Sequence, residues 1–238
     1  MTRRRWIADQ VSGNRAALTG AHADHLMRAL RARVGQEFDI VANGIVRRGV
    51  VVAIADSLVD FELGEEIPAA LAAVHVTLLL AIFKFDRMEW AIEKCTELGV
   101  TGIVPVIARR TDSHLASASV KRVERWRRLV LQASEQSRRA TPPEISDPIK
   151  LREAVNFPAE LKIVLSESEE QIQLFEVAPA PGSGRTLLAI GPEGGWTADE
   201  LDFLQNHGWL SASLGPTILR SETAAIAATA ITISALSR

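Results

Sequence analysis

Short runs of alternating apolar and polar residues fill the first quarter of the chain and predict a small β-rich module. The strand-like runs cover residues 38–41, 49–54 and 59–63. Asn43 and Gly44, between the first two runs, form a pair that is typical of a hairpin turn. Residues 22–33 instead have helical spacing, with Leu26 and Leu30 on one face. We therefore expect a few strands and one short amphipathic helix in this region.

After residue 74 the pattern changes to longer apolar runs that alternate with helical spacing. A strand-like run at 75–83, a helix that begins at Asp86 and ends at Gly99, and a second strand-like run at 100–108 form a βαβ unit. Further strands are expected at 161–165 and 186–190, and further helices at 117–139, 197–208 and 221–236. This alternation predicts an α/β fold with a mostly parallel, doubly wound sheet.

The change of pattern also predicts a domain boundary. Residues 65–72 contain two acids and Pro68, which suit a solvated connection better than a central strand. A chain of 238 residues, 47% of them hydrophobic, is long enough for two unequal cores. We expect domains at residues 1–70 and 71–238.

The charge is distributed unevenly around a net value of −2. Residues 1–50 hold nine Lys and Arg against four acids, 9 − 4 = +5, and residues 120–139 hold seven against two, 7 − 2 = +5. The remainder must therefore sum to −12. Two basic islands in an acidic chain fit an RNA partner, although a pair of solvated helix faces explains them equally well.

The first candidate site is the loop at residues 191–195, Gly-Pro-Glu-Gly-Gly, between an apolar strand and a capped helix. In open α/β sheets ligands bind beyond the carboxyl ends of strands, and glycines there allow the backbone to approach a flat ligand. The loop has neither a dinucleotide nor a Walker fingerprint, and Glu193 would repel a phosphate. A ligand with cationic and hydroxyl groups fits better. A tight connection without a ligand is the alternative.

The second candidate site is the segment 214–225, which leads from an apolar run into the last helix. Ser221 is the expected N-cap residue, with Arg220 and Glu222 on either side. Capping accounts for Ser221 and the helix dipole favours Glu222, but a cation at the positive end of a helix is mildly unfavourable. The position of Arg220 therefore indicates an anionic partner.

These two segments resemble the signature loops of the SPOUT methyltransferases, most closely the 16S ribosomal RNA uridine N3-methyltransferases (the RsmE-like family). The glycine loop is followed, at matching separation, by Leu-Gly, Ile-Leu-Arg and Glu-Thr-Ala. Further matches are Met88-Glu89, Lys94, residues 97–100, Pro105, Arg110, residues 135–137, His25-Leu26 and Leu30-Arg31. Two positions depart from the family pattern. Thr217 replaces a basic residue, which leaves a substrate contact open, and Ser221 replaces a threonine but keeps the hydroxyl.

The resemblance implies a PUA-like β-barrel domain at the N-terminus and a trefoil-knotted SPOUT domain that forms a homodimer. Knots are very rare, so the pattern alone predicts an unknotted sheet. The resemblance also implies S-adenosylmethionine as methyl donor, with S-adenosylhomocysteine as product. The residues expected to bind the donor are Leu165, Ser166, Glu167, Gly191, Pro192, Glu193, Gly194, Gly195, Leu214, Gly215, Ile218, Leu219, Thr223 and Ala224.

The implied activity is methylation of N3 of one uridine, number 1498, in 16S ribosomal RNA, on the assembled small subunit. Uridine N3 carries a proton in neutral water and must lose it before it can attack a methyl group. We expect Arg220 to stabilise the uridine anion, and Glu222 to orient Arg220 or to receive the proton. RNA phosphates are expected at Arg5, Arg28, Arg31, Lys84, Arg110 and Arg138.

Three other functions remain open at this point. The same fold supports 2′-O-methylation of ribosomal or transfer RNA, a catalytically silent protein could keep the fold and bind RNA, and an unrelated α/β enzyme could bind a nucleotide. The single cysteine, Cys95, fits a core position in a reducing cytoplasm, and the five histidines form no metal-ligand set. We expect no metal, no membrane partner and a cytoplasmic location.

Overall fold

The computed structural model describes residues 5–68 and 75–237. The chain divides into two compact units, one of residues 1–71 with 134–141 and one of residues 72–133 with 142–238. The expected boundary between residues 70 and 71 lies outside the described residues. Residues 134–141, which we expected in the C-terminal domain, belong to the N-terminal unit instead.

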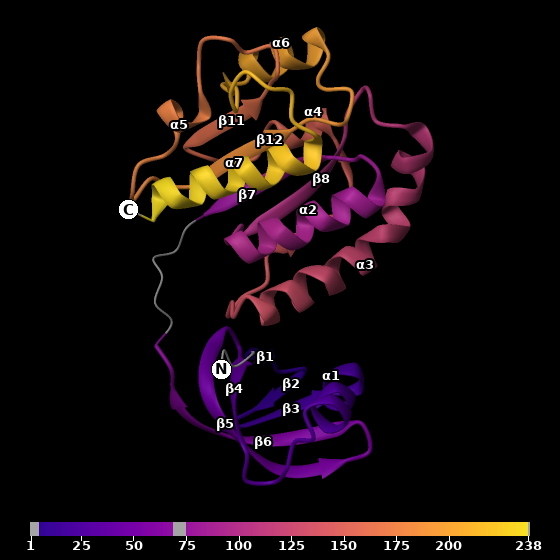
Figure 1. Ribbon diagram of the computed structural model, residues 1–238, viewed down its shortest axis with the longest axis vertical. Coiled ribbons are helices and arrows are strands. Elements are labelled where there is room, and N and C mark those ends of the chain that lie inside the picture. Colours follow the sequence, from indigo (N-terminus) through magenta and orange to yellow (C-terminus); the bar gives the residue numbers. More distant parts are fainter. Residues whose placement is uncertain (1–4, 69–74, 238) are drawn as a thin grey trace. The chain divides into compact units, whose positions relative to one another are not determined.

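The N-terminal unit is built around one six-stranded sheet, shown in indigo and purple in Figure 1. Its strand order is β1 (Arg5–Ile7), β4 (Glu37–Ala42), β5 (Ile45–Ala55), β6 (Leu58–Glu66), β3 (Arg15–Thr19) and β2 (Gln10–Ser12). Asn43 and Gly44 join β4 to β5 with positive φ angles of 52° and 80°, which confirms the predicted hairpin turn.

Two irregularities bend this sheet around its core. The pairing of β5 with β6 shifts register twice, between Arg47 and Gly49 and between Val51 and Ala53. A Cβ on Gly49 would lie only 2.5 Å from Ile40 Cγ1, so glycine is required where the strand bends inward.

The helical segment is shorter than predicted, because α1 (Gly20–Asp24) and a π-helical turn, η1 (His25–Ala29), end before residue 33. Leu30 follows them and is 47% exposed, so it does not share the buried face of Leu26.

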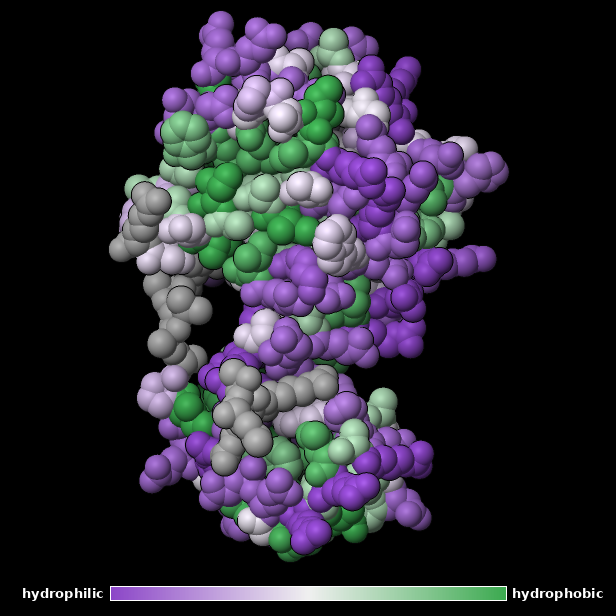
Figure 2. Space-filling view, in the orientation of Figure 1, coloured by the Kyte–Doolittle hydropathy of each residue, from purple (hydrophilic) through white to green (hydrophobic). Residues whose placement is uncertain are grey.

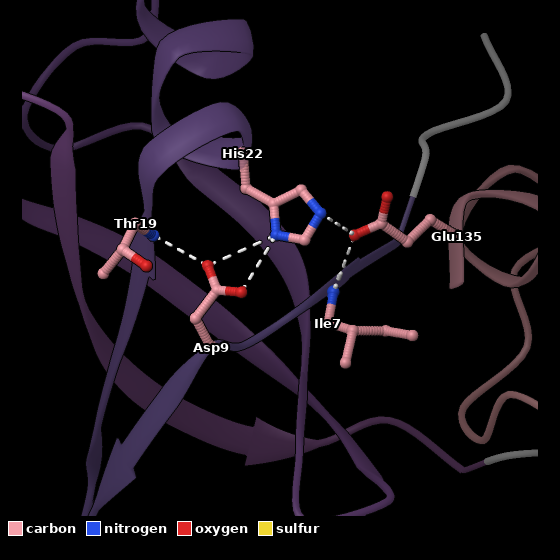
Figure 3. Close-up of polar contacts among 5 residues, drawn as sticks. All are labelled: Ile7, Asp9, Thr19, His22 and Glu135. Atoms are coloured by element: carbon pink, nitrogen blue, oxygen red, sulfur yellow. Dashed lines mark hydrogen bonds and ion pairs between the residues drawn. The ribbon is translucent and has the colours of Figure 1, made fainter. Parts of the chain in front are cut away.

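A polar cluster ties residues 134–141 to the rest of the N-terminal unit (Figure 3). The fully buried carboxylate of Glu135 accepts a hydrogen bond from the backbone N–H of Ile7 at 3.3 Å and lies 3.5 Å from Nε2 of His22. Nδ1 of the same imidazole lies 3.2 Å from the carboxylate of Asp9, which also accepts from the N–H of Thr19. A charge buried inside the unit is therefore surrounded by polar partners.

The C-terminal unit contains a seven-stranded sheet in which every pair is parallel. Its order is β10 (Ile149–Lys150), β8 (Gly102–Ile107), β7 (Val76–Ala81), β12 (Thr186–Ile190), β11 (Leu161–Leu165) and β13 (Leu210–Ala212), with β9 (Glu144–Ile145) also paired to β8. The predicted strands at 161–165 and 186–190 are confirmed residue for residue.

Helices cover both faces of this sheet and create two cores, because side chains alternate between the faces of a strand. Leu78 and Leu80 of β7 pack with α2 (Phe85–Leu98), α3 (Ser113–Gln136) and α7 (Ser221–Leu236), and Figure 1 shows α2 and α7 adjacent. Leu79 and Ala81 face the other core, with α4 (Leu151–Ala154) and α6 (Ala198–Asn206). A last short helix, α5 (Leu174–Val177), packs against α7.

The helix ends agree in part with the sequence signals. Gly99 ends α2 with a φ of 117°, and Thr197 forms the predicted capping box with Glu200 at the start of α6. The N-cap of α2 is Lys84 rather than Asp86, and the N-cap of α7 is Arg220 rather than Ser221. In both helices the cap residue itself makes no side-chain cap hydrogen bond.

Candidate functional site

A pocket opens in the C-terminal unit where β11, β12 and β13 end. This is the carboxyl edge of the parallel sheet, where ligands of open α/β folds bind. All the residues expected to bind the donor line it except Gly194 and Thr223. The lining also includes Ile190, Ser213, Thr217 and Ser221, which we had not predicted.

Three side chains explain why the loop at residues 191–195 needs its glycines. A Cβ on Gly191 would lie 3.2 Å from the indole of Trp196, and one on Gly194 would lie 3.3 Å from the Cδ of Arg110. Gly195 has a φ of +69°, and a Cβ there would overlap a carboxylate oxygen of Glu167. The loop is therefore closely surrounded on several sides.

Trp196 fastens this loop to the neighbouring strand. The residue is 4% exposed, and its Nε1–H donates to the carbonyl of Leu165 at 3.1 Å. Leu165 is the last residue of β11, so the indole bridges two of the loops that line the pocket. A packing role therefore accounts for Trp196 without any contact to a base.

The electrostatics of the pocket favour a ligand with a positive group. Its lining includes the carboxylates of Glu167 and Glu193 but no lysine, arginine or histidine. Within residues 5–68 and 75–237, neither carboxylate makes a hydrogen bond or ion pair. Leu214, Leu219 and Ile218 supply an apolar wall, and Ile218 is 85% exposed at the rim. An isoleucine this exposed beside a pocket is a surface that a flat ligand can cover.

Arg220 stands next to this pocket with an exposed side chain. Its backbone carbonyl accepts the first hydrogen bond of α7, from the N–H of Ala224 at 2.8 Å. In the part of the chain that the structure describes, its guanidinium has no partner. A cation held beside the free N–H groups of a helix start can bind an anion.

Glu222 is placed differently from our expectation. Its Oε1 accepts from Nη1 of Arg87 on α2 at 2.9 Å, and its side chain is only 5% exposed. It does not line the pocket, and no hydrogen bond or ion pair joins its carboxylate to Arg220. Its Oε2 is buried with no partner among the described residues. Arg87 was missed because it precedes the matching pair Met88-Glu89 and carries no signal of its own.

The residues predicted to bind RNA have different surroundings. Lys84 and Arg31 are exposed, Arg28 lies 3.9 Å from Asp24, and Arg5 donates to the carbonyl of Arg138. Arg110 donates to two backbone carbonyls of the glycine loop region. Arg3 and Arg4, which contribute to the first basic island, lie outside the described residues.

The basic island on α3 is partly neutralised within the protein. Arg125 and Arg122 lie 2.8 and 3.4 Å from Glu89, and Arg127 pairs with Glu124 and with Asp147 at 2.9 Å. The charge available to a partner on this helix is therefore smaller than the count of arginines suggests.

Other candidate chemistry is absent from the described residues. Cys95 is fully buried, and this burial raises the pKa of its thiol to about 12, which confirms it as a core residue. Residues 5–68 and 75–237 contain no group of three His, Cys, Asp or Glu side chains that could hold a metal ion. Among these residues, none of the helices has the length and apolar character needed to cross a membrane.

Comparison with known proteins identifies the family. Residues 71–233 match the family described as RNA methyltransferase domain. A ribosomal RNA small subunit methyltransferase E from Synechocystis is 31% identical over 91% of this chain and 72% of that protein. The chain belongs to the ribosomal RNA small subunit methyltransferase E family. The family member from Aquifex aeolicus is 28% identical over 95% of this chain and 97% of its own length.

Solved structures support the fold class expected for this methyltransferase E family. A family member from Neisseria gonorrhoeae, bound to S-adenosylmethionine, has 29% identity and a TM-score of 0.85, with 96% of each chain covered. A Legionella pneumophila methyltransferase structure, also with bound S-adenosylmethionine, has 26% identity and a TM-score of 0.87 over 99% of this chain and 98% of that one. The predicted α/β SPOUT fold with an N-terminal β domain is confirmed, and the trefoil knot stays a prediction.

Matches to some members of the methyltransferase E family are shorter. The match to the Rickettsia conorii protein is 36% identical and spans 62% of its length, and the match to the Mesomycoplasma hyopneumoniae protein spans 66%.

Proposed function

We propose that this protein is an S-adenosylmethionine-dependent methyltransferase of small-subunit ribosomal RNA. The observation that carries the proposal is the pocket at the carboxyl ends of β11, β12 and β13, with two unpaired carboxylates and an apolar rim. The family members named above are methyltransferases of ribosomal RNA, and two similar structures hold S-adenosylmethionine.

The chemistry of the pocket suits this donor. S-adenosylmethionine has a cationic sulfonium, an ammonium group and ribose hydroxyls, which carboxylates such as Glu167 and Glu193 attract. Its adenine is flat and apolar on both faces, which suits Leu214, Ile218 and Leu219. Gly194 and Thr223 lie outside the pocket lining, so we propose an indirect role for them. When bound, the donor supplies an electrophilic methyl group.

We propose N3 of uridine 1498 in 16S ribosomal RNA as the acceptor. N3 becomes a good nucleophile when its proton leaves and the negative charge spreads over the neighbouring carbonyl oxygens. The unpartnered guanidinium of Arg220 can stabilise that charge through charge-assisted hydrogen bonds. Solvent or another group would accept the proton, because Oε2 of Glu222 is closed to solvent.

In this proposal Glu222 is a positioning residue and not the general base. Its ion pair with Arg87 fastens the first turn of α7 to α2, and that turn carries Arg220 as N-cap. We therefore assign Glu222 and Arg87 as residues that position Arg220.

The RNA surface and the dimer are also part of the proposal. Exposed cations such as Arg28, Arg31 and Lys84 would contact phosphates and make RNA affinity depend strongly on salt. The outward face of α7 carries the small residues Ala227 and Ala230, and Figure 2 shows hydrophobic residues gathered over this part of the C-terminal unit. A second copy of the chain could cover this face closely.

The test is methyl transfer from labelled S-adenosylmethionine to small ribosomal subunits that lack the modification, followed by mass spectrometry of the nucleosides. N3-methyluridine as product is the expected result, and naked 16S ribosomal RNA is tested in parallel to identify the preferred substrate. A 2′-O-methylated nucleoside would keep the activity and overturn the target atom. Donor binding without transfer to either RNA would refute the proposed substrate.

A further inference from the structure

Arg110 reaches the loop that lines the donor pocket from a different part of the sheet. It follows β8, and its Nη1 donates to the carbonyl of Gly194 at 2.5 Å and to the carbonyl of Trp196 at 3.2 Å. The aliphatic part of its side chain lies against Gly194, where a Cβ would be 3.3 Å from Cδ. A single guanidinium nitrogen therefore holds two carbonyls on either side of Gly195.

The backbone that carries Arg110 is itself fixed. The hydroxyl of Thr111 accepts from the N–H of Ala108 at 3.1 Å and donates to the carbonyl of Ile82 at 3.3 Å. The N–H of Arg109 donates to Oε1 of Glu200 at 2.7 Å. The turn at residues 108–111 is thus held at the end of β8 by these three hydrogen bonds.

In addition to Arg110, Glu200 also connects this turn to the end of the glycine loop. Its Oε1 accepts from the turn, and its Oε2 accepts from the N–H of Thr197 at 2.9 Å, in the capping box of α6. Residues 194–197 are therefore tied to the turn through Arg110 and through Glu200. On the other side, Gly195 contacts Glu167 of the pocket.

We infer that Arg110 is a positioning residue for donor binding, not a contact to RNA. The inference rests on the proposed function. By holding the carbonyls of Gly194 and Trp196, Arg110 fixes the backbone between them, and with it the place of Gly195 and Glu167 in the pocket wall. Both hydrogen bonds come from Nη1, so this nitrogen is engaged within the protein although the side chain as a whole is exposed.

The test compares Arg110→Ala, Arg110→Lys and the control Arg109→Ala in the full chain. Arg109 is the exposed neighbour, and its side chain makes no hydrogen bond or ion pair in the described residues. Binding of S-adenosylhomocysteine is measured by titration calorimetry, and binding of small ribosomal subunits by filter retention across a salt series. Thermal unfolding without ligand shows whether each variant is folded.

We expect Arg110→Ala to raise the dissociation constant of S-adenosylhomocysteine about tenfold, as the loss of a charge-assisted hydrogen bond would, with RNA affinity within twofold. Arg110→Lys keeps the charge but not the planar geometry, so its donor affinity should be intermediate. Arg109→Ala should match the wild type. Unchanged donor binding in Arg110→Ala, with weaker RNA binding and a smaller salt slope, would overturn the inference alone. A wild-type protein that does not bind S-adenosylhomocysteine would overturn the proposed function as well.

Discussion

Arg220 is an exposed cation at the start of a helix, where the helix dipole opposes it. Nothing within the described chain compensates for this unfavourable interaction. We therefore expect Arg220 to be stabilised by an anion that arrives with the substrate. Replacement of Arg220 by alanine should therefore lower kcat by about 10²–10³-fold, because a donor to the developing charge is lost. Single-turnover methyl transfer measures this, with S-adenosylhomocysteine affinity as the control. Equal losses in turnover and donor affinity would contradict the assigned role.

The ion pair of Arg87 and Glu222 predicts a stability effect that depends on which partner is removed. Arg87→Ala leaves a buried carboxylate without its counter-charge and should lower the free energy of unfolding by about 3 kcal/mol. The double variant Arg87→Met, Glu222→Gln removes both charges and should recover most of that loss. Urea unfolding followed by circular dichroism measures both. A double variant as unstable as Arg87→Ala would show that the buried charge is not the cause.

Sequence patterns identified which residues line the pocket, but they did not identify the long-range contacts that these residues and their neighbours make. The motif matches selected nearly all of its lining, because loops at the carboxyl ends of strands carry a recognisable composition. The partners of Glu222 and Gly194, by contrast, are 135 and 84 residues away along the chain. No local pattern encodes such a contact, so the pairing of Glu222 with Arg87 and the use of Arg110 within the protein required the structure.

At the scale of elements, the glycine loop predicts that two similar substitutions will have different effects. Gly195 and Gly208 both have positive φ angles, of +69° and +79°, so alanine at either should cost ~1 kcal/mol of stability. Only at Gly195 does the new Cβ displace a side chain, that of Glu167, whereas nothing lies within 4 Å at Gly208. Gly195→Ala should weaken S-adenosylhomocysteine binding, and Gly208→Ala should not. Calorimetric titration of the two variants decides this, and equal affinities would refute the role of Glu167.

Elements were predictable where burial forced a clear pattern. All five residues of β12 and the last three of β11 are buried, and most of them are aliphatic, so the limits of both strands follow from composition. The short strands β9 and β10 have two residues each, too few to show a period. The helix expected at 22–33 ended early because Arg31 takes a positive φ of 52°, which breaks the helical path.

At the scale of the whole molecule, the proposed dimer places α7 against a second copy. Ala230→Arg adds a long charged side chain to the outward face of this helix and should convert the protein to monomer. Asn206→Arg, at the exposed end of α6, adds the same charge elsewhere and serves as the control. Light scattering after size exclusion gives the mass of each. A wild-type monomer, or a dimer that tolerates Ala230→Arg, would refute the use of this face.

The sequence predicts the position of the main domain boundary but not the full composition of the two units. A change of period near residue 70 marks where the β-rich pattern ends, but no local pattern assigns residues 134–141 to the first unit. Within this stretch, Glu135 contacts Ile7 and His22 of the β module, which lie more than a hundred residues away along the chain.

The first unit is therefore assembled from two separate stretches of the chain. A fragment that ends at residue 71 would lack Glu135, and the N–H of Ile7 would lose its acceptor. The complementary fragment would expose a carboxylate that is buried in the intact protein. Exchange of the β module between relatives, by recombination or by engineering, would thus have to transfer both stretches together. A swap of the N-terminal stretch alone would leave the unit incomplete.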